Sequence, residues 1–211
     1  MTDRVLLVDS DAFVLLSASG LLPELAVALG LDPDDVRCLP ALRHQLRAGR
    51  SIARRLPPAA VEQARLAAEV ASPWTTPPPD ANLLQRLQFV PQIDDGEALL
   101  LATLVEQPAF LLTTGDKRSL IALGQSAALP DVRDQVRGRI VAVETALVLL
   151  VKRLGATEVG QRLQPFASVH RTVDILFGTK TDFDETETLR QITSYLADLT
   201  RQIGDDLLFP V

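Results

Sequence analysis

The sequence predicts an α/β fold built on a mainly parallel sheet. Short apolar runs rich in Val, Leu and Ile alternate along the chain with segments of helical periodicity. Continuous apolar runs are typical of strands that are buried on both faces of a parallel sheet. The clearest run, at 4–9, passes directly into a helical pattern, and the same order recurs at 109–127 and 139–154. Strands that alternate with helices imply parallel pairing through right-handed crossovers.

In the first half of the chain, Gly, Pro and Asp mark the ends of the expected elements. The proline-rich run at 72–79 is expected to be an extended loop without regular structure. The other expected elements are a strand at 4–9, a helix or broken helix over 11–29, a strand at 36–39, a helix from Pro40 to about Leu46, a basic loop or helix at 48–56 and an alanine-rich helix at 59–71.

The second half has sharper boundaries, because aspartates stand where helices are expected to begin. Residues 174–178 are expected to form a strand or a loop, and the apolar tail at 207–211 is expected to dock on the domain. The remaining expected elements are helices at 80–87, 96–106, 117–127, 144–154 and 184–203, and strands at 109–114 and 139–143. We expect a domain at 1–165 with a C-terminal extension, 166–211, packed on it.

Composition narrows the classes of function. The chain has 211 residues, of which 47% are hydrophobic, so it can bury the core of one domain. A net charge of -6 argues against a protein that coats nucleic acid, but not against an enzyme that cuts it, because a carboxylate-rich metal site is itself acidic. The lone Cys38 fits a reducing compartment, and no apolar run is long enough to span a bilayer. We therefore expect a cytoplasmic protein with no membrane partner.

Basic residues gather in one window, in which six arginines occur between Arg37 and Arg55 without any acid. This window is either a solvated helix face or a local site for phosphates, for which Arg43 and Arg47 are the candidates. Lys117 and Arg118 are similarly either phosphate contacts or solvated residues of a first helical turn.

Acidic residues follow the predicted strands or open the predicted helices. Asp9 and Asp11 follow the first strand, Asp116 follows the strand at 109–114, and the cluster of Asp94, Asp95 and Glu97 opens a helix. Each could simply cap a helix. Carboxylates that converge at one edge of a sheet repel one another unless they share a cation, and ligands that are all oxygen favour Mg²⁺ or Mn²⁺. Such a site supports hydrolysis at phosphorus.

Four segments, in this order and spacing, resemble a PIN domain over about residues 3–165. They are Val5-Leu-Leu-Val-Asp9-Ser-Asp11, Asp94-Asp-Gly-Glu97-Ala-Leu-Leu-Leu-Ala102, Leu111-Leu-Thr-Thr-Gly-Asp116-Lys-Arg, and Ile140-Val-Ala-Val-Glu-Thr-Ala-Leu-Val-Leu-Leu150. The resemblance implies a three-layer α/β/α fold with a mainly parallel sheet, here followed by a helical C-terminal extension. It also implies a Mg²⁺- or Mn²⁺-dependent endoribonuclease.

Carried over residue by residue, the resemblance assigns catalysis and metal binding to Asp9, Glu97 and Asp116. Thr114 matches the hydroxyl residue before the last acid. Metal ligation by Asp11, Asp94 and Asp95 and substrate contacts from Thr114, Lys117, Arg118, Arg43 and Arg47 complete the expected site. RNA is the expected substrate. An antitoxin-like protein partner, as in a toxin–antitoxin pair, and a homodimer are further partners that this family suggests.

Departures from the family pattern leave two alternatives open. The position of an expected acid on the helix after the second strand holds His44 or Gln45, and Gly115 stands where a second acid is common. A degenerate PIN-like module that binds RNA or protein without cutting is therefore the first alternative. The second is a phosphatase of the haloacid-dehalogenase type, with Asp9 and Asp11 as its nucleophile motif, Thr113 or Thr114 as its hydroxyl, and Asp205 and Asp206 as metal ligands. That alternative requires a strand just before Asp205.

Overall fold

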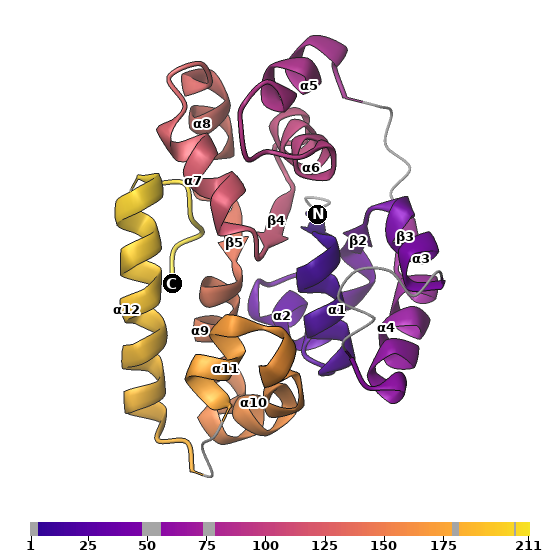
Figure 1. The fold of residues 1–211 in the computed structure, drawn as a ribbon, viewed down its shortest axis with the longest axis vertical. Helices are drawn as coiled ribbons and strands as arrows, with labels where there is room; N and C mark the ends of the chain where they lie inside the picture. Colours follow the sequence, from indigo (N-terminus) through magenta and orange to yellow (C-terminus); the bar gives the residue numbers. More distant parts are fainter. Residues whose placement is uncertain (1–3, 48–55, 74–78, 179–181, 205) are drawn as a thin grey trace.

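The computed structural model describes residues 4–47, 56–73, 79–178, 182–204 and 206–211, and these form an α/β fold (Figure 1). A parallel sheet with the strand order β3-β2-β1-β4-β5 lies at its centre. The strands are β1 (Leu6–Val8), β2 (Val36–Cys38), β3 (Ser72–Pro73), β4 (Leu111–Thr114) and β5 (Ile140–Ala142). The mainly parallel sheet expected from the sequence is confirmed.

Helices make up most of the rest of the described chain. They are α1 (Ser10–Ala18), α2 (Leu22–Ala28), α3 (Pro40–Arg47), α4 (Pro58–Val70), α5 (Ala81–Gln88), α6 (Asp95–Glu106), α7 (Lys117–Gln125), α8 (Pro130–Val136), α9 (Val143–Leu154), α10 (Ala156–Leu163), α11 (Arg171–Phe177) and α12 (Glu185–Ile203). Short 3₁₀ turns cover Pro33–Asp35 and Gln164–Val169.

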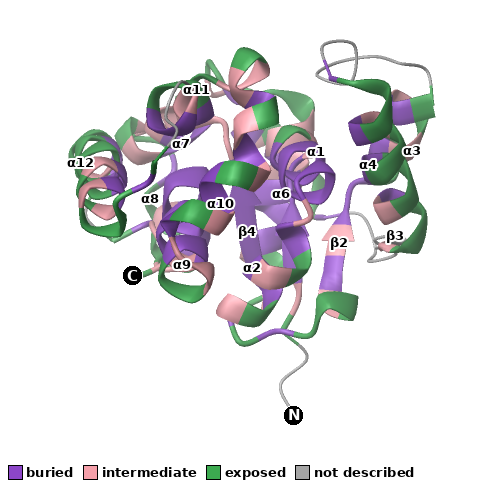
Figure 2. Ribbon diagram, turned by 90° about the horizontal axis from the view of Figure 1, so that it is seen from below, coloured by how far each residue is buried: buried purple, intermediate pink, exposed green. Residues whose placement is uncertain are grey.

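The two faces of the sheet carry separate apolar cores, which makes the fold three-layered. Alternate side chains of a strand point to opposite faces. Leu6 and Val8 accordingly pack with α1–α4 and α9–α11, whereas Leu7 packs with α5–α8. Figure 2 shows the central strands as buried between these helices. The α/β/α arrangement expected from the resemblance is therefore present.

The C-terminal segment packs on both cores and covers one edge of the sheet. Phe177 belongs to the first core, and Leu199 near the end of α12 belongs to the second. Beyond α12, Leu208 bridges to Ile140 and the Phe209 amide donates to the carbonyl of Ile140 at 2.7 Å. The apolar tail thus docks, as expected, and it shields the β5 edge, which would otherwise expose unpaired backbone groups.

Two expectations about local structure were wrong. Residues 174–178 are not a strand or a loop: α11 covers Arg171–Phe177, with Val173, Leu176 and Phe177 buried at helical spacing. The run at 72–79 is not wholly irregular, because Ser72–Pro73 pairs with β2 as an edge strand, where proline is tolerated. Residues 74–78 and most of the basic segment, 48–55, lie outside the described residues.

The expected broken helix at 11–29 is confirmed as α1 and α2. Gly20, with φ +67°, follows the end of α1, and the two helices meet at 104°. Within the described residues, no single helix has the length and apolar character needed to cross a membrane. Only α1 and α2 taken together meet that requirement, and most of their residues lie in the core.

We predict that Gly124→Ala lowers the free energy of unfolding by about 1–3 kcal/mol, the usual cost of overpacking. A Cβ at Gly124 in α7 would lie 2.3 Å from the carbonyl oxygen of Ile203, so α7 and α12 would have to separate. Gly96→Ala in α6 is the control, since its Cβ would meet nothing closer than 3.4 Å. Chemical denaturation of both variants measures the difference. Equal stability of the two variants would contradict the packing of α12 on α7.

Candidate active site

The candidate site lies where the direction of the sheet connections reverses. β1 lies between β2 and β4. The helices that follow β1 pack on one face of the sheet, and those that follow β4 pack on the other. Connections that diverge in this way leave a crevice at the carboxyl ends of the two central strands, which is where open α/β sheets bind ligands. Asp9 directly follows β1, and Asp116 comes two residues after β4.

Each of the three principal acids is fixed at the beginning of a helix. Asp9 caps α1 by accepting the Ala12 amide at 2.7 Å. Asp116 caps α7 by accepting the amides of Arg118 at 2.8 Å and Ser119 at 3.1 Å. Glu97 belongs to the first turn of α6, so three helix N-termini, each with a partial positive charge, hold these carboxylates.

Glu97 also has a structural role at the start of α6. The Asp94 amide donates to Glu97 Oε2 at 2.8 Å, and the Glu97 amide donates to Asp94 Oδ1 at 2.9 Å. This reciprocal pair is a capping box, which stabilises the start of α6. The capping box accounts for an acid at this position and fixes its carboxyl group, but it does not require a second acid on the neighbouring helix α7.

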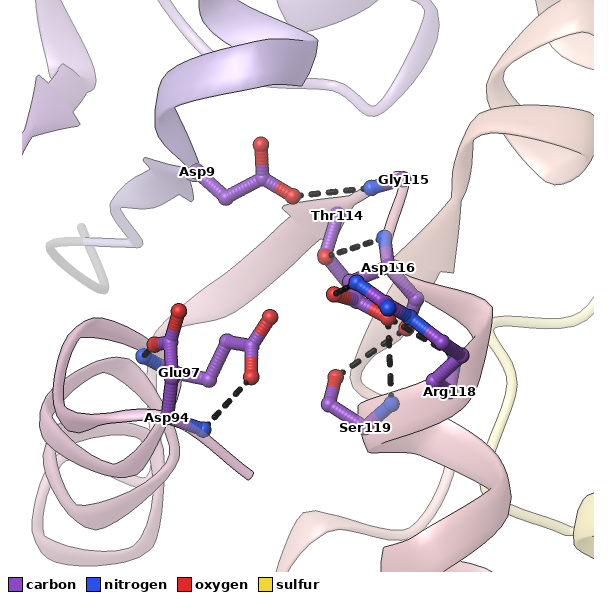
Figure 3. A network of polar contacts seen from close by, with 8 residues as sticks. All are labelled: Asp9, Asp94, Glu97, Thr114, Gly115, Asp116, Arg118 and Ser119. Carbon is purple, nitrogen blue, oxygen red and sulfur yellow. Dashed lines mark hydrogen bonds and ion pairs between the residues drawn. The ribbon is translucent and has the colours of Figure 1, made fainter. Parts of the chain in front are cut away.

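The carboxyl group of Glu97 on α6 points toward that of Asp116 at the start of α7 (Figure 3), and the two groups interact. Burial, reinforced by the neighbouring Asp116, raises the pKa of Glu97 to about 8. Burial would also raise the pKa of Asp116. The hydrogen bonds that it accepts from Glu97 and from the amides of Ser119 and Arg118 lower it instead. At neutral pH the pair therefore shares one proton, which Glu97 carries and Asp116 accepts.

Asp9 lies at the same edge and joins the two central strands. Its Oδ2 accepts the Gly115 amide at 2.8 Å, and the Thr114 hydroxyl is a further hydrogen-bond partner. The Thr114 oxygen in turn accepts the Asp116 amide at 3.1 Å. Burial raises the pKa of Asp9, and these hydrogen bonds oppose the rise. Asp9 and Thr114 thus fix the turn that carries Asp116.

The three further acids expected as metal ligands do not form a metal-binding group with this pair among the described residues. Asp94 is engaged in the capping box of α6. Asp95 is exposed and accepts the side-chain amide of Gln88 on α5 at 2.8 Å. Asp11 is exposed on the first turn of α1.

The cations expected to contact substrate have differing surroundings. Arg43 donates to the carbonyls of Ala68 and Ala71 at 2.8 Å, so it caps the end of α4. The Arg47 guanidinium on α3 lies 3.6 Å from the carboxylate of Glu69, which also belongs to α4. Arg118 is different, because its guanidinium lies 3.5 Å from Asp116 and is largely exposed. Of these three arginines, Arg118 is therefore the one whose side chain lies at the acidic pair and is exposed to solvent.

A half-buried ion pair beside the site was not expected from the sequence. Lys117 Nζ lies 2.7 Å from Glu144 Oε1, and the Glu144 side chain is only 2% exposed. Thr172 on α11 donates to the same oxygen at 3.1 Å, and the Lys117 ammonium lies 5.8 Å from the ring centre of Tyr195 on α12. Glu144 stands directly after a strand within an apolar run, and that position was the available indication.

Histidine does not join the acids. His170 caps α11, where its Nδ1 faces the Val173 amide at 3.5 Å. Burial lowers the pKa of His170, so the ring is neutral near pH 7.

The donor set suits a hard divalent cation, but only two carboxylates converge. Among the described residues, no group of three or more Asp, Glu, His or Cys side chains is placed to hold a metal ion. Mg²⁺ needs no more than one or two carboxylates, since it keeps several waters and binds substrate phosphates. Glu97 and Asp116 meet this requirement because a cation could replace the proton that they share. Asp9 Oδ1 accepts the Ala12 amide, Oδ2 accepts the Gly115 amide, and the Thr114 hydroxyl is a third partner of the same carboxylate.

Comparison of the chain with protein-family models, with curated proteins and with solved structures finds no match. Function must therefore be argued from the site itself.

We predict unequal costs for breaking the Lys117–Glu144 pair from its two ends. Lys117→Met leaves a buried carboxylate without its cation and should lower the free energy of unfolding by about 3 kcal/mol. Glu144→Gln should cost only about 1–2 kcal/mol, because the Lys117 side chain is 38% exposed and can turn to water.

The double variant Lys117→Met/Glu144→Gln is the control for this comparison. It should be more stable than Lys117→Met alone, because no buried charge remains unpaired. Urea denaturation at neutral pH measures all three variants, and a larger loss for Glu144→Gln than for Lys117→Met would contradict the assignment.

We predict that Glu97→Gln makes the protein relatively more stable as the pH rises. The pKa of Glu97 is about 8 in the folded chain and about 4.5 in the unfolded chain. The folded state thus holds an extra proton between these values, and the stability that this proton provides is lost as the pH rises through 8. Glutamine keeps the capping box and can still donate to Asp116.

Unfolding of the two proteins should be compared from pH 5 to pH 9. At pH 9 the variant should be the more stable by on the order of 1 kcal/mol, since half-exposed charges are screened by water. Glu187→Gln is the control, because Glu187 also lies in the first turn of a helix, α12, but accepts from Arg190. This variant should show no gain in stability at pH 9. A difference between wild type and Glu97→Gln that does not vary with pH would contradict the shared proton.

Proposed function

We propose that the chain is a divalent-metal-dependent endoribonuclease of PIN type. The observation that carries this proposal is the contact between Glu97 and Asp116 at the carboxyl ends of the central strands. Two carboxyl groups in contact are costly unless a proton or a cation lies between them. Their position at the reversal point of a parallel sheet is where a ligand is expected. The choice of RNA rests on the resemblance of the four acidic and apolar segments to PIN domains.

In this proposal Glu97 and Asp116 hold Mg²⁺ or Mn²⁺. A bound cation of this kind supplies Lewis-acid stabilisation of a phosphodiester and lowers the pKa of a water molecule. Asp9 and Thr114 position the Asp116 turn through the Gly115 and Asp116 amides. Arg118 offers a charge to the phosphate next to the acids. Lys117 forms an ion pair with Glu144 and so stabilises the start of α7.

A catalytically inactive PIN-like module is the second candidate. It is favoured by the convergence of two rather than three acids among the described residues. The position of an expected acid on α3 is held by His44, which is exposed, or by Gln45, which is half-buried. The antitoxin-like partner and the homodimer remain predictions of the resemblance, and the cytoplasmic location remains a prediction from composition.

The phosphatase alternative lacks the element that it requires. A strand should precede Asp205, but α12 runs to Ile203 and ends at Gly204, with φ +96°. Asp206 forms an ion pair with Arg137 at 2.6 Å. We do not propose this activity.

Mn²⁺ titration of the whole chain tests the proposed nuclease. Calorimetry should detect binding to wild type, and both Asp116→Asn and Glu97→Gln should abolish it at comparable concentrations. Cleavage of single-stranded RNA in Mn²⁺ should fall by at least about 100-fold in both variants, the scale of losing an electrostatic element of a catalytic site.

Asp184→Asn is the matched control, because Asp184 caps α12 through the Glu187 amide and asparagine caps equally well. It should bind Mn²⁺ and cleave RNA as wild type does. Binding of RNA by wild type without Mn²⁺ binding or cleavage would overturn the nuclease and support the inactive module.

A further inference from the structure

An open cleft of about 600 Å³ adjoins the carboxylate pair, and the proposed function does not yet use it. Its walls are the turn between α5 and α6, Phe89–Gln92, and one face of α7. That face consists of Arg118, Ile121, Ala122 and Gln125. The spacing of three, four and seven residues places these side chains on the same side of the helix. At a rise of 1.5 Å per residue, the face extends for about 10 Å.

The cleft lies next to the acidic site, and Arg118 belongs to both. Arg118 lines the cleft, and its guanidinium lies 3.5 Å from the Asp116 carboxylate that contacts Glu97. A phosphate held by Arg118 would therefore lie at the edge of the cleft, within reach of the face of α7. Arg118 thus belongs to the cleft and also lies next to the carboxylate pair.

The chemistry of the cleft differs from that of the chain as a whole. The protein carries a net charge of -6, yet none of the described residues that line the cleft is acidic, and Arg118 is the charged one. Gln92, Gln125 and Ser126 add neutral donors and acceptors. An anionic strand would meet attraction here and no repulsion from the walls.

An aromatic ring stands open in one wall. Among the described residues, Phe89 is the one phenylalanine that is exposed, and its exposed fraction is 77%. It follows α5 directly and begins a turn in which Gln92 has φ 76°, a conformation that non-glycine residues seldom adopt. A solvent-exposed aromatic beside a cation and side-chain amides is the composition of a surface that stacks single-stranded bases.

We propose that this cleft is a subsite for one unpaired base of the single-stranded nucleic acid that the carboxylate pair acts on. The base stacks on Phe89, and the adjoining phosphate lies at Arg118. A volume of about 600 Å³ is within the range of small-ligand pockets, so the cleft can hold one base with its sugar. The identity of the strand rests on the proposed nuclease. The new assignment is that the cleft contributes to the binding of that strand.

A double-substitution experiment on protein and RNA tests the subsite. Binding of a fluorescein-labelled single-stranded RNA is measured by anisotropy in metal-free buffer, where the strand stays intact. Phe89→Ala should weaken binding by about 5- to 150-fold, the range that stacking of one base on an aromatic ring supports. Removing a single base from the RNA should weaken binding to wild type by a similar factor at one position of the strand. The same removal should not weaken binding to Phe89→Ala further.

Val70→Ala is the control, because Val70 is 79% exposed at the end of α4 and does not line the cleft. It should bind the RNA as wild type does. Failure of wild type to bind, unchanged binding by Phe89→Ala, or independent effects of the two substitutions would overturn the subsite. Loss of self-association or of protein binding in Phe89→Ala, with RNA binding intact, would overturn it in favour of a protein-docking surface.

Cleavage by wild type in Mn²⁺ is measured in parallel, so that the two proposals can fail separately. Cleavage without a Phe89 effect would leave the nuclease in place and remove the subsite. A coupled effect of Phe89 and one base without any cleavage would remove the nuclease and keep the cleft as a strand-binding site.

Discussion

The carboxyl groups of Glu97 and Asp116 are kept in contact by the backbone that holds each of them. Asp116 is fixed by the amides at the start of α7, and Glu97 is fixed by the capping box at the start of α6. Neither acid can move away without giving up hydrogen bonds that stabilise a helix end. The repulsion between them is therefore relieved by a shared proton, which the raised pKa of Glu97 reflects. Cation binding at this edge would use the same preorganisation.

The sheet topology makes this contact available. Because the connections after β1 and β4 leave on opposite faces, the carboxyl ends of these strands are not covered by a crossover. Asp9 links the two ends by accepting the Gly115 amide across the reversal point. The Lys117–Glu144 pair then ties the start of α7 to α9 and, through Thr172, to α11, so the C-terminal segment contributes to the rigidity of the site.

Much of the fold followed from local patterns. The strands β1, β4 and β5 and the helix α9 were predictable from their apolar runs, and α6 and α12 were predictable because apolar periodicity and aspartate caps agreed there. α11 was missed because seven residues give too short a pattern to separate a helix from a strand, and the edge strand β3 was missed because proline argues against pairing. In both cases tertiary packing decided the conformation. The cleft at Phe89 was also beyond sequence, since its two walls come from separate helices.

The sequence by itself determined the class of the fold, the order of most of its strands and helices along the chain, and the acids that could serve chemistry, because these depend on residue types and short spacings. Only the tertiary structure decided which acids meet. Glu97 and Asp116 come together, Asp95 turns to Gln88, and Arg43 is taken up by α4. The physical reason is that the direction of a side chain at a helix end depends on how neighbouring helices cross the sheet, and no local pattern encodes that relation.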